Sequence, residues 1–379
     1  MSPAVLIDMS NLVVGGGVQV GASFLDELAR LVGDPQALRR WPWLRDVAVE
    51  ASEAVVANAT APRGSLRVTV VDGRPAARLR RRPRGDEFDV SFTVFGPDYG
   101  SRRARTRMVG FADVTSLFPE HAAIHGRRAR LRHAVRSRVS CRAFRAADLV
   151  VAESAHVTAA LEERWGIPRR RLRVVPNVLN RVFTDESLRE PLSVQVHHRP
   201  AFAFPTRAYP HKNLALLGAA ARILREEHGR DVEFLLTLTD DEWQALDPDT
   251  RAASRNAGPL RVSQVPSLYA ACDGVVFPSL NECFSVTPLE ALRAGRPLVA
   301  SDRPFVREVA GDAAWYFDPI EPASLARALL DVTADDALRA TRVADGLRVA
   351  DGWPTGRDRA AAYLDLVDET LASGATRPG

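Results

Sequence analysis

Lysine is almost absent from this chain, whose 379 residues include 50 arginines and a single lysine, Lys212. A coding bias that replaces lysine by arginine wherever either cation serves explains the imbalance, but not why one position kept its lysine. Cysteine is also scarce, since Cys141, Cys272 and Cys283 are too few and too scattered for a disulfide framework or a zinc site. We therefore expect a reduced, cytoplasmic compartment.

Long apolar runs are absent too, which excludes a transmembrane helix from the expected elements. The first residues lack a basic segment and include Asp8, so we do not expect a signal peptide. With 46% hydrophobic and 26% charged residues, the composition excludes a chain that is disordered throughout. A length of 379 residues favours two domains over one.

Charge is distributed unevenly along the chain. Residues 1–180 contain 29 arginines against 18 acidic residues, whereas residues 181–379 contain 22 basic against 29 acidic residues. Arginines cluster at 78–84 and at 127–145. These clusters form either a solvated surface or a surface for an anionic partner, such as a bilayer or a phosphorylated acceptor. Nucleic acid is the weaker prediction, because no aromatic residues are interleaved with the arginines and no helix-turn-helix pattern is present.

Short apolar runs alternate with amphipathic stretches along most of the chain. In the front half, strands are predicted at 4–7, 68–71, 92–95, 149–152 and 172–175, with helices at 18–32 and 155–165. In the back half, strands are predicted at 201–205, 232–238, 274–277 and 297–300, with helices at 214–227, 288–294, 323–330, 336–348 and 356–371. This alternation indicates an α/β protein with two Rossmann-like halves, each a parallel sheet covered by helices. We expect an N-terminal domain at 1–180, a C-terminal domain at 181–352 and a final segment at 353–379.

The segment with the most chemical information is 277–302, FPSLNECFSVTPLEALRAGRPLVASD, in which seven residues separate Glu282 from Glu290. Thr287 and Pro288 are predicted to be the N-cap and first residue of a helix. The backbone N–H groups around 284–287 would then face the carboxyl end of the preceding strand, where they suit an anion or sugar hydroxyls. The structural alternatives are a capping box between Thr287 and Glu290, and a solvated loop position for Glu282.

A second segment, PTRAYPHKN at 205–213, places Arg207 and Lys212 before a predicted helix. A nucleoside-diphosphate leaving group needs its developing negative charge neutralised. Arginine binds phosphate through a planar fork, whereas lysine acts as a compact point charge on a flexible stem. The alternative is an ordinary surface pair beside a helix.

A third segment, Gly15–Gly17, follows the first predicted strand and opens a helix. Glycines at a helix start let a phosphate approach the backbone. The run does not match the dinucleotide-binding fingerprint and carries no Walker lysine. A plain tight turn is therefore its alternative.

Taken together, segment 277–302 resembles the signature of family 4 retaining glycosyltransferases, the GT-B enzymes of glycosyl transferases group 1, of the bacterial surface-polysaccharide type. The matching residues are Glu282, Glu290, Ala291, Gly295, Pro297, Val299, Ala300 and Ser301. The resemblance extends more thinly over residues 4–370, including VVPNV at 174–178, where Asn177 would mark the crossover into the back domain. Ser285 is a departure, because many members have glycine there.

This resemblance implies a GT-B fold, with two Rossmann-like domains facing across a cleft and a C-terminal helix crossing back to the first domain. It assigns Arg207 and Lys212 to the donor diphosphate, Glu290 to the ribose hydroxyls and Glu282 to the reacting sugar as a catalytic residue. Further donor contacts would come from Gly16, Gly17, Phe284, Ser285, Val286 and Thr287. Many members also place a histidine near the reacting carbon, for which His121 and His125 are the candidates.

The implied activity is retaining, metal-independent hexosyl transfer from a UDP- or GDP-linked sugar to a glycan or lipid-linked acceptor in cell-surface polysaccharide synthesis. No cofactor is expected, and Asp240–Asp241 precede an ordinary helix-like stretch, which is not a convincing site for a metal motif. We expect a cytoplasmic protein that contacts an anionic membrane at its periphery. The alternatives are a nucleotide-sugar epimerase, a phosphorylase, whose pyridoxal phosphate would need Lys212, and a non-catalytic protein that binds nucleotide-sugars or polyanions.

Overall fold

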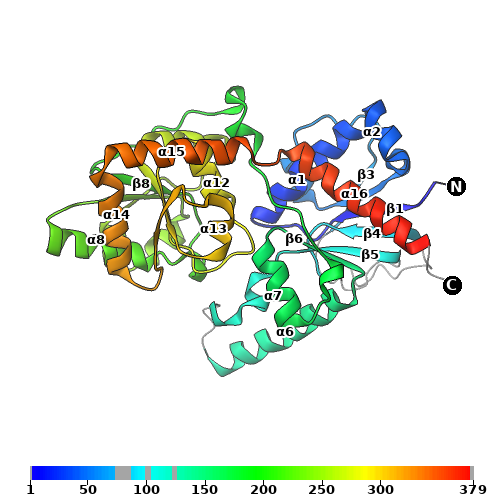
Figure 1. The fold of residues 1–379 in the computed structure, drawn as a ribbon, viewed down its shortest axis with the longest axis horizontal. Helices are drawn as coiled ribbons and strands as arrows, with labels where there is room; N and C mark the ends of the chain where they lie inside the picture. The colour runs from blue at the N-terminus through cyan, green and yellow to red at the C-terminus, as the bar shows by residue number, and fades with distance from the viewer. Residues whose placement is uncertain (1, 73–86, 99–103, 122–125, 376–379) are drawn as a thin grey trace. The chain divides into compact units, whose positions relative to one another are not determined.

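The computed structural model describes residues 2–72, 87–98, 104–121 and 126–375, which fall into two compact units (Figure 1). Unit 1 comprises Met1–Leu117, Ile124–Asn177 and Pro354–Gly379, and unit 2 comprises Phe118–Ala123 and Val178–Trp353. The arginine cluster at 78–84 and the candidate His125 lie outside the described residues.

Unit 1 is built on a seven-stranded sheet in the order β3-β2-β1-β4-β5-β6-β7, with every neighbouring pair parallel. Its strands are β1 Val5–Met9, β2 Ala48–Ala51, β3 Val68–Val70, β4 Phe88–Thr93, β5 Ala104–Phe111, β6 Leu149–Ala152 and β7 Leu172–Val174. The strand order reverses beside β1, as in Rossmann folds. The prediction of a parallel α/β architecture is therefore confirmed for the front half.

Helices cover both faces of this sheet. They are α1 Gly16–Val32, α2 Pro35–Arg40, α3 Glu53–Asn58, α5 Val114–Leu117, α6 Arg127–Ala146, α7 Ala155–Trp165 and α16 Gly356–Ala375. On one face, Phe24 of α1 and Tyr363 of α16 pack their rings against Phe92 of β4. On the other face, Phe111 of β5 meets aromatic rings of α6 and α7. Because successive side chains of a strand point to opposite faces, the strands contribute to the core on both sides of the sheet.

The C-terminal helix α16 belongs to unit 1, although the preceding 176 residues from Val178 to Trp353 fold as unit 2. Trp43 donates its indole N–H to Asp368 of α16 at 2.7 Å, and Trp41 donates to Asp365 at 3.1 Å. Tyr363 of the same helix is fully buried. The last helix therefore crosses back to complete the core of the front unit, as the resemblance implied.

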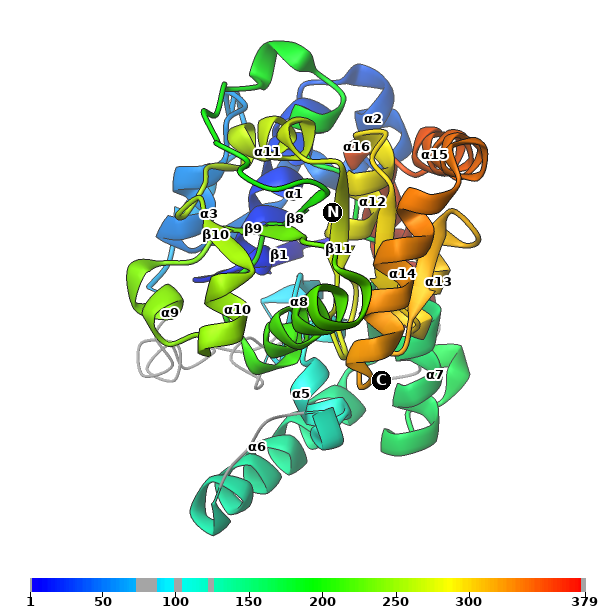
Figure 2. The same ribbon diagram turned by 90° about the vertical axis from the view of Figure 1, so that its left-hand side faces the viewer.

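Unit 2 repeats the same plan with a six-stranded parallel sheet in the order β10-β9-β8-β11-β12-β13. Its strands are β8 Ala201–Phe204, β9 Glu233–Leu236, β10 Ser254–Asn256, β11 Gly274–Phe277, β12 Leu298–Ser301 and β13 Ala314–Phe317. Its helices are α8 Ala215–His228, α9 Asp240–Gln244, α10 Pro248–Ala252, α11 Val265–Ala271, α12 Val286–Arg293, α13 Pro304–Ala310, α14 Pro322–Ala334 and α15 Asp336–Asp351. Figure 2 shows the molecule from another side and labels β8, β9, β10 and β11 of this sheet.

Four strands were not predicted from the sequence: β2, β5, β10 and β13. In β5, ARTRMVGF, arginines alternate with smaller residues before the apolar end, so no apolar run marks the start of the strand. The three residues of β10 are polar and only partly buried. Within the described part of the chain, no helix combines the length and apolarity needed to cross a membrane.

Gly110 of β5 provides a test of the tight packing in unit 1. A Cβ at this position would lie 1.7 Å from the carbonyl oxygen of Val94, so backbone must shift to accommodate it. We expect Gly110→Ala to destabilise the protein by roughly 2–3 kcal/mol, as overpacking of a core does. Chemical denaturation measures this, with Gly33→Ala as the control, because a Cβ at Gly33 makes only ordinary contacts. Equal free energies of unfolding for Gly110→Ala and Gly33→Ala would contradict the close approach of Gly110 to Val94.

Candidate active site

The sheet of unit 2 reverses its order between β8 and β11, and both strands are followed by loops that carry candidate residues. The loop after β8 contains Arg207 and Lys212, and the loop after β11 contains Glu282. In open parallel sheets, ligands bind beyond the carboxyl ends of the strands at such a reversal. Topology therefore places these residues where a ligand site is expected.

Backbone and amide hydrogen bonds join the two loops. The N–H of Leu280 donates to the carbonyl of His211 at 2.8 Å. Asn213 donates its amide to the carbonyl oxygens of Pro278 at 3.3 Å and Pro319 at 2.8 Å. Its backbone is left-handed, with φ 59°, a conformation that asparagine tolerates better than most residues. Sequence reasoning missed Asn213, although an asparagine between two predicted elements is a signal for a left-handed residue that could have indicated it.

Lys212 and Glu282, which are 70 residues apart in sequence, form an ion pair in this site. The Nζ atom of Lys212 lies 2.7 Å from Oε1 of Glu282, and the two side chains are only 16% and 12% exposed. The ammonium also lies 5.7 Å from the centre of the Phe277 ring, over its face. A partly desolvated pair of this kind needs both partners, because either charge alone would be poorly solvated.

His211 lies beside this pair and was not singled out from the sequence. Its ring stacks on Tyr209, with centroids 5.7 Å apart and planes inclined by 8°. Burial lowers the pKa of His211, and the nearby charge of Lys212 lowers it further, against the opposing influence of Glu282. The shift favours the neutral imidazole over the charged one.

Arg207 forms a different ion pair from Lys212. Its Nε atom lies 2.9 and 2.8 Å from the two carboxylate oxygens of Glu242 in α9, and its side chain is 52% exposed. Burial alone would raise the pKa of Glu242, but hydrogen bonds from Arg207, Thr239 and Ala208 lower it to about 2. Asp240 and Asp241 are the first residues of α9, whereas from the sequence they were predicted to lie before a helix.

The helix after Glu282 begins earlier than predicted. Ser285 is the N-cap of α12 and Val286 its first residue, so the prediction of Thr287 as N-cap with Pro288 first was wrong. Proline is accepted at the third position because first-turn N–H groups have no helical partner. No side chain caps this helix start, so the capping box with Glu290 does not form. Ser285 has an extended backbone, with φ −131°, and needs none of glycine's conformational freedom.

Glu290 therefore lies in the second turn of α12, where it is buried. The hydroxyl of Tyr269 in α11 donates to its Oε2 atom at 2.9 Å. Burial raises the pKa of Glu290 to about 7, even though the hydrogen bond from Tyr269 acts to lower it. Burial also raises the pKa of Tyr269 well above its ordinary value, so the phenol remains a donor. This partner of Glu290 was not predicted from the sequence.

The candidate residues between the two glutamates contribute in different ways. The Phe284 ring packs against Trp353 at 6.1 Å, so its backbone is the part that remains for a ligand. Ser285 is buried, whereas Val286 and Thr287 are partly exposed at the start of α12. The exposed N-terminal turn of this helix, without a side-chain cap, presents backbone donors to an anion or to hydroxyl oxygens.

The remaining candidates are the glycines of unit 1, Asn177 at the end of that unit, and His121 in the short segment Phe118–Ala123. Gly15 has φ 69° and precedes α1, whose first residues are Gly16 and Gly17. A Cβ at Gly16 would meet no atom within 4 Å, so this helix start is open. His121 ends a short 3-10 helix, Pro119–His121, and its side chain lies outside the described residues. Asn177 accepts a 2.6 Å hydrogen bond from Arg359 of α16, which suits a structural role at the crossover.

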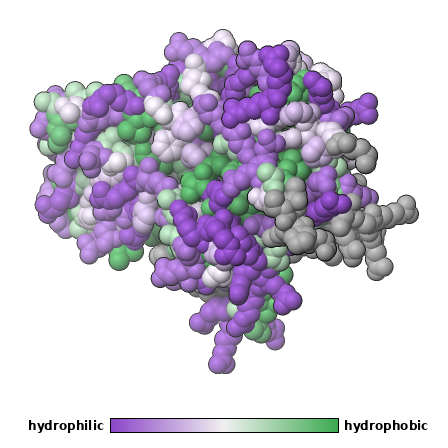
Figure 3. All heavy atoms as spheres, turned by 45° about the vertical axis from the view of Figure 1, so that its right-hand side comes forward, coloured by the Kyte–Doolittle hydropathy of each residue, from purple (hydrophilic) through white to green (hydrophobic). Residues whose placement is uncertain are grey.

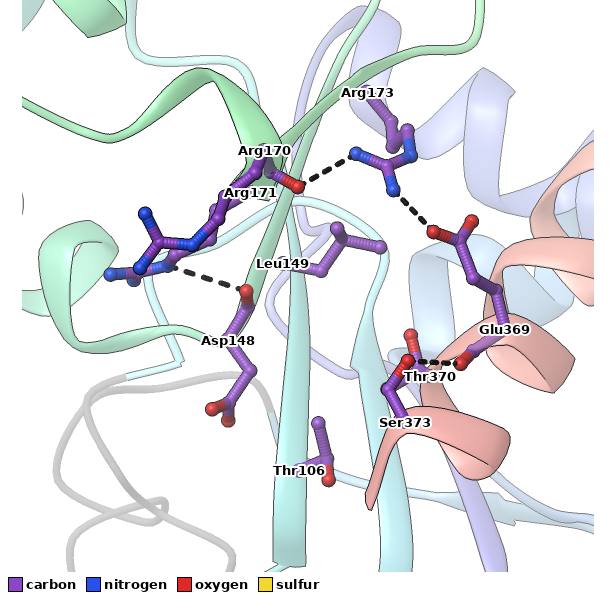
Figure 4. A pocket seen from close by; sticks show the side chains of 9 residues that line it. All are labelled: Thr106, Asp148, Leu149, Arg170, Arg171, Arg173, Glu369, Thr370 and Ser373. Carbon is purple, nitrogen blue, oxygen red and sulfur yellow. Dashed lines mark hydrogen bonds and ion pairs between the residues drawn. The ribbon is translucent and has the colours of Figure 1, made fainter. Parts of the chain in front are cut away.

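A separate polar pocket lies in unit 1, where the parallel strands β5, β6 and β7 begin (Figure 4). Arg171 donates there to the carbonyl oxygens of Arg145 at 2.7 Å and Asp148 at 3.3 Å, and so closes the end of α6. Arg173 pairs with Glu369 of α16. Because its cations hold helix ends in place, this pocket is structural and not a second candidate site.

Comparison with known proteins identifies the family. The model of Glycosyltransferase Family 4 matches residues 14–183, and that of Glycosyl transferases group 1 matches residues 199–335. The chain belongs to the family 4, group 1 glycosyltransferases. One relative is the O-antigen chain mannosyltransferase B of Escherichia coli, 33% identical over 147 residues. That match spans 37% of this chain and 39% of the relative, well under half of its length.

Solved glycosyltransferase structures share the fold of this member of the family. The crystal structure of HepE from Anabaena in complex with UDP-glucose has a TM-score of 0.66 and 17% identity, covering 98% of this chain and 100% of that one. WaaG, a glycosyltransferase involved in lipopolysaccharide biosynthesis, has a TM-score of 0.63 and 14% identity, covering 96% and 99%. The GT-B fold that the resemblance implied is therefore confirmed.

Glu290 should make stability depend on pH. Its pKa is about 7 in the folded chain, against ~4.3 in an unfolded one, so between these values the folded state holds a proton that the unfolded state releases. The free energy of unfolding therefore falls as pH rises through this window. We expect Glu290→Gln to match the parent protein near pH 4 and to exceed its stability by roughly 3–4 kcal/mol at pH 8.

Urea unfolding at both pH values measures this difference. Glu226→Gln, on the exposed side of α8, is the control and should leave the pH dependence unchanged. A constant difference between Glu290→Gln and the parent protein at all pH values would show that this carboxyl is not protonated by burial.

Proposed function

We propose that this glycosyltransferase moves a hexosyl group from a UDP- or GDP-linked sugar to a glycan or lipid-linked acceptor, with retention of configuration, in cell-surface polysaccharide synthesis. The observation that carries the proposal is the Lys212–Glu282 pair at the strand-order reversal of unit 2. It holds one cation and one carboxylate side by side. The cation suits the diphosphate of a donor, and the carboxylate suits its reacting sugar.

Lys212 is proposed to neutralise the diphosphate as the bond from the anomeric carbon to the leaving phosphate breaks. Glu282 would lie beside that carbon, where positive charge develops before the acceptor oxygen bonds to it and passes its proton to the departing diphosphate. The short Lys212–Glu282 contact supports these roles, because it holds both groups in defined positions before the donor arrives. Closing the pair in the free protein also keeps each charge compensated.

Arg207 and Glu290 are proposed to hold the rest of the donor. Arg207 uses its Nε atom on Glu242, and its exposed guanidinium edge can serve the diphosphate as a second cation. Tyr269 fixes the Glu290 carboxyl through one oxygen and leaves the other for the ribose hydroxyls. With two cations assigned to the diphosphate, we propose a reaction without a metal or other cofactor.

The donor's base and sugar remain to be found by experiment. The Escherichia coli relative is named as a mannosyltransferase, and the HepE crystals hold UDP-glucose. GDP-mannose and UDP-glucose are therefore the first donors to test. We propose that the reaction takes place in the cytoplasm, at the inner face of an anionic membrane that carries the acceptor.

Thermal unfolding with a panel of UDP, GDP, UDP-glucose and GDP-mannose tests the donor class. A ligand at a hundredfold its dissociation constant adds about 2.7 kcal/mol to the free energy of unfolding. We expect a rise in melting temperature with one base and not with the other, with the diphosphate contributing most of it. No rise with any of the four, together with no donor consumption when acceptor is present, would favour a non-catalytic protein. Conversion of the sugar without an acceptor would indicate an epimerase.

Lys212→Arg tests the proposed role of the lone lysine. A larger, planar guanidinium cannot reproduce a compact ammonium held 2.7 Å from Glu282 in a mostly buried position, so we expect donor turnover to fall roughly tenfold or more. The fold should remain intact by circular dichroism. Arg199→Lys is the matched control, because this 59% exposed residue pairs with Asp273 at the other end of the β11 strand. Near-normal kcat/KM in Lys212→Arg would refute the assignment.

A further inference from the structure

The carboxylate of Glu242 joins the loops that follow β8 and β9 in unit 2. From the first loop, Arg207 donates through Nε to both carboxylate oxygens, and the N–H of Ala208 donates to Oε1 at 3.2 Å. From the second loop, Thr239 donates its N–H to Oε2 at 3.0 Å and its hydroxyl to the same atom at 3.2 Å. The Glu242 side chain is only 19% exposed, and these donors occupy its oxygens, so it is not itself available to a ligand.

A second contact between the same two loops fixes the backbone next to Arg207. The N–H of Thr206 donates to the hydroxyl oxygen of Thr237 at 2.9 Å, and that hydroxyl donates to the carbonyl of Thr206 at 3.1 Å. Both threonines are buried. Because Thr206 is held on one side of Arg207 and Ala208 on the other, only the side-chain torsions of the arginine remain to be fixed.

The guanidinium of Arg207 meets its carboxylate in a different way from that of Arg307, another arginine of unit 2. Arg307 gives Asp302 both Nε, at 2.5 Å, and Nη2, at 2.8 Å, which is the ordinary two-nitrogen contact. Arg207 gives Glu242 only Nε. Among the residues that the structure describes, none forms a hydrogen bond or ion pair with Nη1 or Nη2 of Arg207. The pair therefore occupies the inner nitrogen of the guanidinium and leaves its terminal fork unused.

Two structural explanations compete with a functional one. Hydrophilic residues cover most of the face that Figure 3 shows, so an ion pair at the surface is not by itself evidence of a function, and a half-exposed pair adds little to stability. Glu242 also completes a capping box with Thr239 at the start of α9. The cap needs the contacts with Thr239 but not those with Arg207 and Ala208. Neither explanation accounts for a terminal fork that is held in place and left unused.

We propose that Glu242 is a positioning residue, which holds Arg207 so that Nη1 and Nη2 together meet a phosphate group of a nucleoside diphosphate. A fork presented in this way gives two parallel hydrogen bonds to one phosphate. A long side chain that is ordered before the ligand arrives loses less conformational entropy on binding. The inference rests on the proposed function, which assigns Arg207 to the donor diphosphate, and it adds the residue that orients this arginine and the edge of the guanidinium that binds.

The sign of the effect of removing the Glu242 charge distinguishes positioning from simple electrostatics. By charge alone, the loss of a carboxylate beside the site would strengthen the attraction for an anionic donor. If Glu242 positions Arg207, its loss weakens the binding of the diphosphate instead, because the fork is no longer held in place.

Glu242→Gln tests this in the full chain, because glutamine at this helix position still suits a capping box. We expect the KM for the nucleotide-sugar and the dissociation constant of UDP or GDP to rise together, roughly fivefold or more, with a smaller change in kcat. A general loss of folded protein would lower kcat and leave KM unchanged. Asp231→Asn is the matched control, since it removes the partner of Arg225 at the other end of β9 and should change none of these constants. An unchanged or smaller dissociation constant in Glu242→Gln would overturn the proposal.

The same change in an Arg207→Ala background shows whether Glu242 acts through Arg207. Without the arginine, the Glu242 carboxylate only repels the diphosphate. We therefore expect Glu242→Gln to lower the dissociation constant of the diphosphate in this background, or to leave it unchanged. Weaker binding in both backgrounds would mean that Glu242 acts on the structure of the site in general, and would also overturn the proposal.

The role of Glu242 and the proposed function fail in different ways. If the parent protein and Glu242→Gln bind UDP or GDP and consume donor equally well, only the role of Glu242 is refuted. If Glu242→Gln weakens diphosphate binding but the parent protein transfers sugar to no acceptor, only the glycosyl transfer is refuted. A parent protein that binds neither UDP nor GDP refutes both.

Discussion

The ion pair between Lys212 and Glu282 is the contact on which the candidate site depends. It joins the loops that follow the two central strands of unit 2, so it cannot form unless β8 and β11 are paired in register. The hydrogen bonds of Asn213 and Leu280 hold the same two loops together. The pair is thus a consequence of the sheet order, and its position at the strand-order reversal follows from parallel topology.

Much of the fold could be predicted from the sequence because buried parallel strands are marked by apolar runs. LVVA at 149–152 and GVVF at 274–277 coincide with β6 and β11. β5 and β10 could not be predicted in this way, since arginines or polar residues interrupt them and only pairing with neighbouring strands makes them strands. The start of α12 was misplaced because Thr287–Pro288 imitates a cap, whereas an extended Ser285 begins the helix.

In the candidate site, too, the sequence indicates some residues, whereas only the fold brings their partners beside them. The two glutamates and the basic residues stand out through their spacing and local context. Their partners do not, because Tyr269 lies 21 residues before Glu290 and Glu242 lies 35 residues after Arg207. Burial raises the pKa of Glu290 to about 7, although Tyr269 acts to lower it, whereas hydrogen bonds that include the one from Arg207 lower the pKa of Glu242 to about 2. Neither the burial of Glu290 nor the pairing of Glu242 can be seen in the sequence, because both depend on segments that are distant along the chain.

The structure explains why arginine replaces lysine on α6 but not at position 212. On α6, the arginines are exposed to solvent, where lysine or arginine would serve equally well as a cation. At position 212 the cation is mostly buried, contacts a single carboxylate oxygen and lies over an aromatic ring. A compact ammonium fits that position, whereas a fork of five donors would leave several of them without partners in a poorly hydrated pocket. The bias toward arginine therefore stops at the position where the shape of the cation, and not its charge alone, determines the contact.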